Sequence, residues 1–126
     1  MTNEFTHFNS DGQAHIVDVG NKAVTKREAI AKACIFMASS TIDKINRGAF
    51  AKGDVLSVAQ IAGILGAKHT ATLIPLCHPI ALDHVDLIFN INNKSKAVEI
   101  SAKCSTIGKT GVEMEALTAV SIAALT

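Results

Sequence analysis

The chain has 126 residues, 48% of them hydrophobic, which is the length and composition of one globular domain spanning residues 1–126. A formal net charge of +1 and an aromatic content of 4% argue against partners such as nucleic acid or an anionic membrane surface. No apolar run approaches the roughly 20 residues that cross a bilayer. The three cysteines lack the spacing of a disulfide framework and predict free thiols in a cytoplasmic protein.

The N-terminal third of the chain mixes clear and ambiguous signals. Residues 1–14 are expected to form a flexible arm that ends in the turn signal at 10–12, and residues 15–19 a short strand. Residues 26–37 carry apolar side chains at every second position, as a strand does, but their alanine content also suits a helix. The residues alone leave the structure of this segment open.

Two helices are predicted in the middle of the chain. The first runs from about residue 40 to 47 and is closed by Gly48 at a C-cap position. The second runs from about residue 54 to 68, with Asp54 as its N-cap. Its predicted buried stripe consists of Val55, Val58, Ile61, Ala62 and Leu65.

The C-terminal half predicts a β-hairpin followed by a helix. Strands at 84–91 and 97–104 flank a polar turn at 92–95. The last helix is expected to start at Gly111. Its apolar pattern runs to Thr126 without a stop signal, so the chain is expected to end within this helix.

The stretch from 105 to 119 places glycines, a lysine and two carboxylates at the start of that last helix. Thr110 is the predicted N-cap, and Glu113, three residues later, completes a capping box. Gly111 would then be the first helical residue, with a free backbone N–H that attracts an anion. A P-loop is excluded, because that motif needs a glycine where Lys103 stands.

Two prolines bracket the short loop that contains Leu76, Cys77 and His78, and they hold it in a restricted set of conformations. A histidine presented in this way suits proton transfer or ligand binding, while a structural bond from its ring to a carbonyl is the alternative. Nothing in the sequence indicates an activated thiol at Cys77, so an inert thiol is favoured there. The spacing of Cys77, His78 and His84 disfavours a zinc site.

Glu113 and Glu115 are two residues apart, which separates them by roughly 200° around a helix. We therefore expect them to serve different edges of a pocket, or different subunits, rather than to act as a simple carboxylate pair. Lys52 precedes a predicted helix start, where a lysine and the helix dipole suit phosphate together. A solvated surface lysine is the alternative for Lys52.

Three motifs in this order carry a resemblance to a known family: residues 52–55 (KGDV), 74–79 (IPLCHP) and 106–119 (TIGKTGVEMEALTA). Together with HIVDV at 15–19 they resemble the cyclic pyranopterin monophosphate synthase family of molybdenum cofactor biosynthesis. The resemblance implies an α+β, ferredoxin-like sandwich with an antiparallel sheet and helices on one face. It therefore predicts a strand at 26–37, and it implies a homohexamer, a trimer of dimers, with active sites between subunits.

The family converts (8S)-3',8-cyclo-7,8-dihydroguanosine 5'-triphosphate to cyclic pyranopterin monophosphate and releases pyrophosphate. The resemblance thus implies a phosphorus–oxygen lyase without a redox cofactor or a resident metal, with Mg²⁺ left open as a companion of the triphosphate. It implies catalytic roles for Lys52, His78, Glu113 and Glu115. The substrate-binding residues that it implies are Arg27, Lys68, Leu76, Cys77, Thr110, Gly111 and Met114.

The family also carries an Asp-x-x-Lys pair, with a catalytic lysine, just beyond the position that matches Thr126. The 126 residues do not include this pair. A second hypothesis from the sequence is therefore a catalytically inactive form that binds nucleotide or serves as a scaffold.

Overall fold

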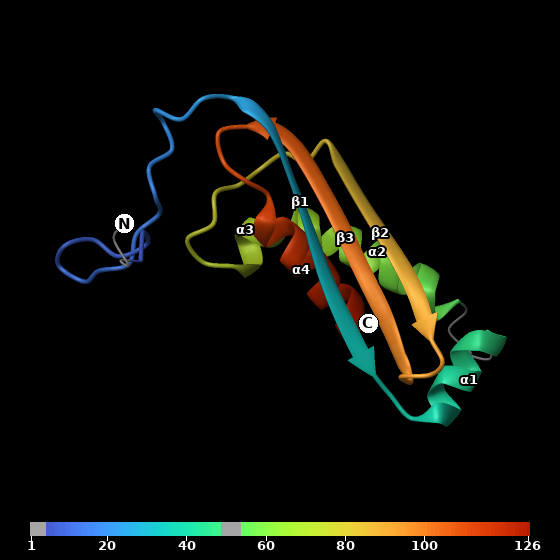
Figure 1. Ribbon diagram of the computed structural model, residues 1–126. Helices are drawn as coiled ribbons and strands as arrows, with labels where there is room; N and C mark the ends of the chain where they lie inside the picture. The colour runs from blue at the N-terminus through green and yellow to red at the C-terminus, as the bar shows by residue number, and fades with distance from the viewer. Residues whose placement is uncertain (1–4, 49–53) are drawn as a thin grey trace.

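The computed structural model describes residues 5–48 and 54–126 (Figure 1). Its elements follow in the order β1 (Thr25–Phe36), α1 (Ser39–Arg47), α2 (Val55–Lys68), α3 (Thr70–Leu73), β2 (His84–Asn92), β3 (Ala97–Gly108) and α4 (Glu113–Leu125). No helix within these two ranges has the length and apolar character that crossing a membrane requires.

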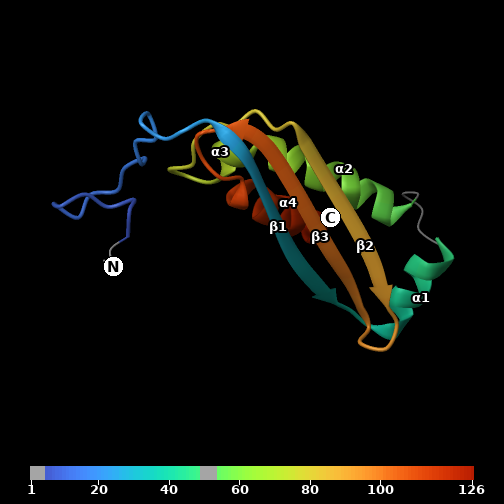
Figure 2. The same cartoon turned by 45° about the horizontal axis from the view of Figure 1, so that its top comes forward.

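The described strands form an antiparallel sheet in the order β1–β3–β2, with β3 in the centre. The register of β1 on β3 runs from Thr25 opposite Gly108 to Phe36 opposite Ala97. Helices α2 and α4 lie side by side against one face of this sheet, and α1 lies beyond the turn of the β2–β3 hairpin (Figures 1 and 2). The predicted α+β, ferredoxin-like architecture is confirmed.

Strand β1 decides the structure of the segment that the residues left open. Its odd-numbered positions, from Ala29 to Ile35, pack toward the helices, and its even-numbered positions are exposed. The strand predicted from the family resemblance is therefore confirmed. Its inward side chains are mostly alanines, so the helix layer can approach the sheet closely.

The predicted ends of α1, the N-cap of α2 and the turn of the hairpin also agree with the structure. Gly48 closes α1 in a left-handed conformation, with a φ of 64°. The side chain of Asp54 caps α2 by accepting a hydrogen bond from the Leu56 amide at 3.1 Å. The hairpin forms as predicted, with β3 extending to Gly108.

The predicted buried stripe of α2 is wrong. Val58, Ile61 and Leu65 are 45%, 61% and 50% exposed, and the residues that the helix buries are Ala59, Gly63, Gly66 and Ala67. The cause is the close approach of α4 and β2. A Cβ atom at Gly63 would lie 3.0 Å from the Ala119 carbonyl oxygen and 2.6 Å from Leu87 Cδ2. Periodicity located an apolar face, but only the smallest side chains fit between the two helices.

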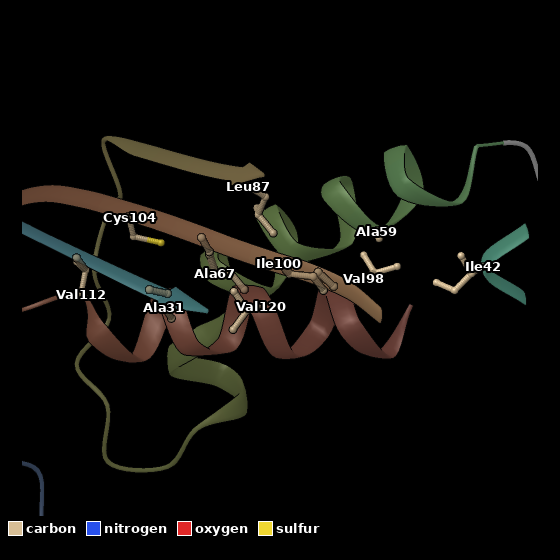
Figure 3. Packing of buried hydrophobic residues seen from close by; sticks show 14 residues of the cluster. Ala31, Ile42, Ala59, Ala67, Leu87, Val98, Ile100, Cys104, Val112 and Val120 are labelled. Carbon is tan, nitrogen blue, oxygen red and sulfur yellow. The ribbon is translucent and has the colours of Figure 1, made fainter. Parts of the chain in front are cut away.

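Helix α4 likewise buries its small side chains and leaves larger ones exposed. Its buried positions include Ala116, Ala119 and Ala123, while Leu117 is 48% exposed. Figure 3 shows the resulting core, in which short aliphatic side chains lie between the central strand and the two helices. Large apolar side chains such as Leu65 and Leu117 therefore remain exposed on the helix layer.

The strand expected at residues 15–19 does not form, because no neighbouring strand pairs with this segment within the described residues. Upstream of it, Phe8 and Ala14 form an isolated antiparallel bridge. The side chain of Asn9 accepts hydrogen bonds from the amides of Asp11 and Gln13, at 3.0 and 2.9 Å. We refer to residues 5–17 as the N-terminal arm.

Candidate active site

A pocket of about 190 Å³ lies where the loop after α3 meets the segment that leads into α4. It is lined by His7, Leu76, Cys77, His78, Ile80, Thr110, Gly111, Glu113, Met114 and Glu115. Eight of the eleven residues that the sequence pointed to therefore meet in one place. A cavity of about 360 Å³ on the open face of the sheet is larger, but none of those eleven residues lines it.

The loop after α3 owes its shape to Pro75 and to an unusual backbone at Leu76. Pro75 fixes its own φ, and Leu76 follows with a φ of 68°, which is the pattern of a type II turn. A leucine in this conformation costs on the order of 1–3 kcal/mol, so the surrounding structure must hold it there. The turn directs the Leu76 and Cys77 side chains to the pocket.

Two hydrogen bonds fasten the continuation of this loop to the end of β3. Thr106 donates from its hydroxyl to the Ala81 carbonyl at 2.6 Å, and the Asp83 carboxylate accepts from the Ile107 amide at 3.0 Å. The two sides of the pocket are therefore tied to the same end of the central strand.

His78 is half-buried, and its Nε2 lies 2.5 Å from the carbonyl oxygen of Val17 in the N-terminal arm. A carbonyl oxygen only accepts, so Nε2 carries the hydrogen of this bond. In the neutral ring, Nδ1 is then the nitrogen that can take a proton. The structural and the chemical interpretations of this histidine are thus compatible, because each uses a different ring nitrogen.

The predicted capping box at the start of α4 is wrong. The helix begins at Glu113, its N-cap is Val112, and no side chain caps it. Val112 is fully buried, and its anchoring in the core sets the helix start. Gly111 consequently precedes the helix, and Thr110 lines the pocket rather than capping the helix.

Glu113 and Glu115 both line the pocket, the first exposed and the second buried, which is compatible with the expectation that they serve different edges of it. Glu113 is the first residue of the helix, and its carboxylate folds back over Gly111, where a Cβ atom would overlap it. A helical wheel does not predict such a side chain. Its negative charge at the helix N-terminus is also favourable for the helix dipole.

Glu115 has the most perturbed environment of the pocket carboxylates. It is 3% exposed, and this burial raises the pKa of its carboxyl group. A hydrogen bond from its own amide lowers the pKa, and the nearby charge of Glu113 raises it. The net shift is upward, so the protonated form of this carboxyl group is favoured more than in a solvated glutamate.

The two thiols nearest this carboxylate are held in the protonated form. Burial raises the pKa of Cys77, and the charge of Glu115 raises it further. The same two causes, in the same order, raise the pKa of Cys104 to about 11. A thiolate is therefore disfavoured at Cys77, in agreement with an inert thiol that shapes the pocket.

Two of the predicted site residues that the structure describes, Arg27 and Lys68, do not line the pocket. Arg27 donates to the carbonyls of Gly108, Ala23 and Lys109, at 3.2, 3.0 and 3.5 Å, and so braces the link between β3 and α4. Lys68 borders a separate cavity of about 500 Å³, which shares Ile80 with the pocket. Lys52 lies outside the described residues.

Two pocket residues, His7 and Ile80, were not predicted from the sequence. The arm has no periodicity or spacing that points to the site, so no local signal distinguishes His7 from other exposed histidines. Across residues 5–48 and 54–126, no group of three or more histidine, cysteine, aspartate or glutamate side chains is arranged to hold a metal ion.

Comparison with known proteins places this chain in a family. The MoaC family model matches residues 16–126. The chain belongs to the MoaC family. A relative from Thermoanaerobacter pseudethanolicus is 52% identical over 121 residues, which cover 96% of this chain and 77% of the relative. One from Peptoclostridium acidaminophilum is 57% identical over 123 residues, covering 98% and 77%.

Both relatives bear the name cyclic pyranopterin monophosphate synthase. The resemblance inferred from the three motifs is therefore confirmed. As a MoaC family member, the chain is assigned to molybdenum cofactor biosynthesis.

Proposed function

We propose that this chain is a cyclic pyranopterin monophosphate synthase. It would rearrange the cyclic dihydroguanosine triphosphate to cyclic pyranopterin monophosphate and release pyrophosphate, as a phosphorus–oxygen lyase. The observation that carries the proposal is the convergence of His78, Glu113 and Glu115 on one pocket, in a chain 52–57% identical to proteins of that name.

Proton transfer is the chemistry that this pocket supports best. Ring opening and reclosure of the substrate require protons to be removed and returned. Glu115 provides a buried carboxyl group with a raised pKa, and His78 provides a ring whose Nδ1 remains available. Two titratable groups in different environments suit an acid and a base in one site.

Basic residues around the pocket are the proposed partners of the triphosphate. Lys68 borders the cavity that adjoins the pocket at Ile80, which supports a triphosphate extending in that direction. Arg27 holds its guanidinium beside the link into α4. Lys52 completes the proposed set, and Mg²⁺ would enter only with the triphosphate.

The proposed assembly is a homohexamer built as a trimer of dimers. It is supported by the exposed large apolar side chains of α2 and α4, such as Ile61 and Leu117, since contiguous exposed apolar surface commonly marks an interface. A cytoplasmic location is also part of the proposal. All three cysteines are free thiols, as in proteins of a reducing compartment.

The test is incubation of the enzyme with the cyclic intermediate, with pyrophosphate release and product formation measured together. His78→Ala and Lys52→Ala should each lower turnover by roughly 10²–10⁴-fold, as expected for loss of an acid–base or electrostatic group. Lys94→Ala, in the exposed hairpin turn, is the matched control and should leave turnover unchanged. Near-normal turnover in the His78 or Lys52 variant, with the fold intact, would refute the assigned roles.

A further inference from the structure

His7 brings a second imidazole to the pocket from a distant part of the sequence. It lies about seventy residues before His78 and more than a hundred before the glutamates, yet it lines the same pocket as all three. None of the catalytic or binding roles assigned above includes it. Its position follows from the fold of the N-terminal arm.

The arm that carries His7 is built by specific hydrogen bonds. The His15 amide donates to the His7 carbonyl at 2.7 Å, and the Asn9 amide donates to the Gln13 carbonyl at 2.9 Å. The bond between Val17 and the ring of His78 then attaches the end of the arm to the site. His7 is therefore held near the pocket by the same segment that orients His78.

The two ring nitrogens of His7 have different surroundings. Nδ1 lies 3.4 Å from the His15 carbonyl oxygen, which is a long contact. Nε2 has no hydrogen-bond partner among the residues that the structure describes. Because a protonated imidazole donates from both nitrogens, His7 can contact its own arm and still offer a donor to a ligand.

Charge indicates which part of a ligand His7 would meet. The described lining contains two carboxylates, which repel phosphate, and its only side chains that can become cationic are His7 and His78. His78 already uses Nε2 on Val17. The proposed function uses the remaining Nδ1 of His78 for proton transfer. His7 Nε2 is therefore the imidazole nitrogen left to donate to a triphosphate in this part of the site.

We propose that His7 is a further substrate-contacting residue, whose imidazole donates a hydrogen bond to a phosphate oxygen of the triphosphate and of the departing pyrophosphate. This inference rests on the proposed function, because that function supplies a triphosphate substrate. The role is binding rather than bond cleavage, so it affects KM and product affinity more than kcat.

The experiment compares the wild-type enzyme with His7→Ala, His7→Lys and His15→Ala. Pyrophosphate binding is measured by calorimetry, and kcat and KM are measured with the cyclic intermediate. We expect His7→Ala to weaken pyrophosphate binding and raise KM at least fivefold, with kcat changed less. His7→Lys, which keeps a cationic donor, should restore most of both. His15→Ala keeps the backbone contacts of the arm and should match the wild type.

Two results would overturn the proposal: wild-type pyrophosphate affinity and KM in folded His7→Ala, or no pyrophosphate binding by the wild-type enzyme. A failure of the proposed function looks different. In that case pyrophosphate binding depends on His7, but the wild-type enzyme does not convert the cyclic intermediate. The binding measurement thus separates the role of His7 from the identity of the reaction.

Discussion

At the scale of single residues, Glu115 combines burial with an ionisable group and so links stability to pH. Its pKa is raised in the folded protein, mainly by burial. Between the ordinary carboxyl pKa and this raised value, the folded chain holds a proton that the unfolded chain has lost. Stability therefore falls as pH rises through that window.

Glu115→Gln removes this titration and keeps the shape of the side chain. We expect the variant to be more stable than the wild type at pH 7.5, and the difference to be smaller at pH 4.5, where about half of the unfolded chains also carry the proton. Turnover should fall by roughly 10²–10⁴-fold. Thermal unfolding at the two pH values tests the first point, and a stability difference that does not vary with pH would contradict it.

Arg27 has two candidate roles. The structure shows it bracing the link between β3 and α4, and the family resemblance implies that it binds phosphate. Its guanidinium donates hydrogen bonds to the carbonyl of Ala23, which precedes β1, and to the carbonyls of Gly108 and Lys109, at the end of β3 and just after it. Loss of these bonds should cost about 1–3 kcal/mol of stability. Arg27→Lys keeps the charge but not the fork of donors.

We therefore expect Arg27→Lys to be nearly as destabilised as Arg27→Ala in denaturant unfolding. Substrate affinity in the two variants then measures separately how much the positive charge contributes to phosphate binding. If the lysine variant regains full stability, the bracing role is wrong and the charge alone matters.

At the scale of the elements, the helix layer depends on the absence of side chains where α2 crosses α4. A Cβ atom at Gly63 would meet Leu87, the Ala119 carbonyl and Ala123 at once. The carbonyl cannot move without shifting α4. Alanine normally favours a helix over glycine by about 1 kcal/mol, but overpacking costs about 1–3 kcal/mol.

Gly63→Ala should therefore lower the free energy of unfolding, by up to about 2 kcal/mol. Gln60→Ala on the exposed side of the same helix serves as the control and should stay within about 0.5 kcal/mol of the wild type. Urea unfolding of both variants measures the difference. A stabilised Gly63→Ala variant would mean that the two helices are less closely packed than described.

The elements also show where prediction from sequence succeeds. Caps and turns depend on one or two residues, and Asp54, Gly48 and the hairpin turn were predicted correctly. The buried face of α2 depends on how near α4 lies, which no local pattern records. The same holds for the site: the motifs located His78 and the two glutamates, whereas the contribution of His7 depends on how the arm folds.

At the scale of the whole molecule, the exposed apolar side chains of the helix layer favour association. We expect light scattering at micromolar concentration to give a mass several times the 13.2 kDa of one chain. Ile61→Asp and Leu117→Asp should each shift this mass downward, because an aspartate in an apolar interface is left without a partner. Lys94→Ala should leave it unchanged. A monomer in the wild-type protein would contradict the proposed hexamer.

The pocket gathers side chains from three segments that are far apart in the sequence: the arm, the loop after α3 and the start of α4. Closing such long loops costs chain entropy before any contact is gained. The pocket therefore cannot form until the fold has brought these three segments together. During synthesis, the pocket can form only after the ribosome has released the chain beyond Glu115. Substrate bound in this pocket therefore cannot stabilise any folding step that takes place before that point.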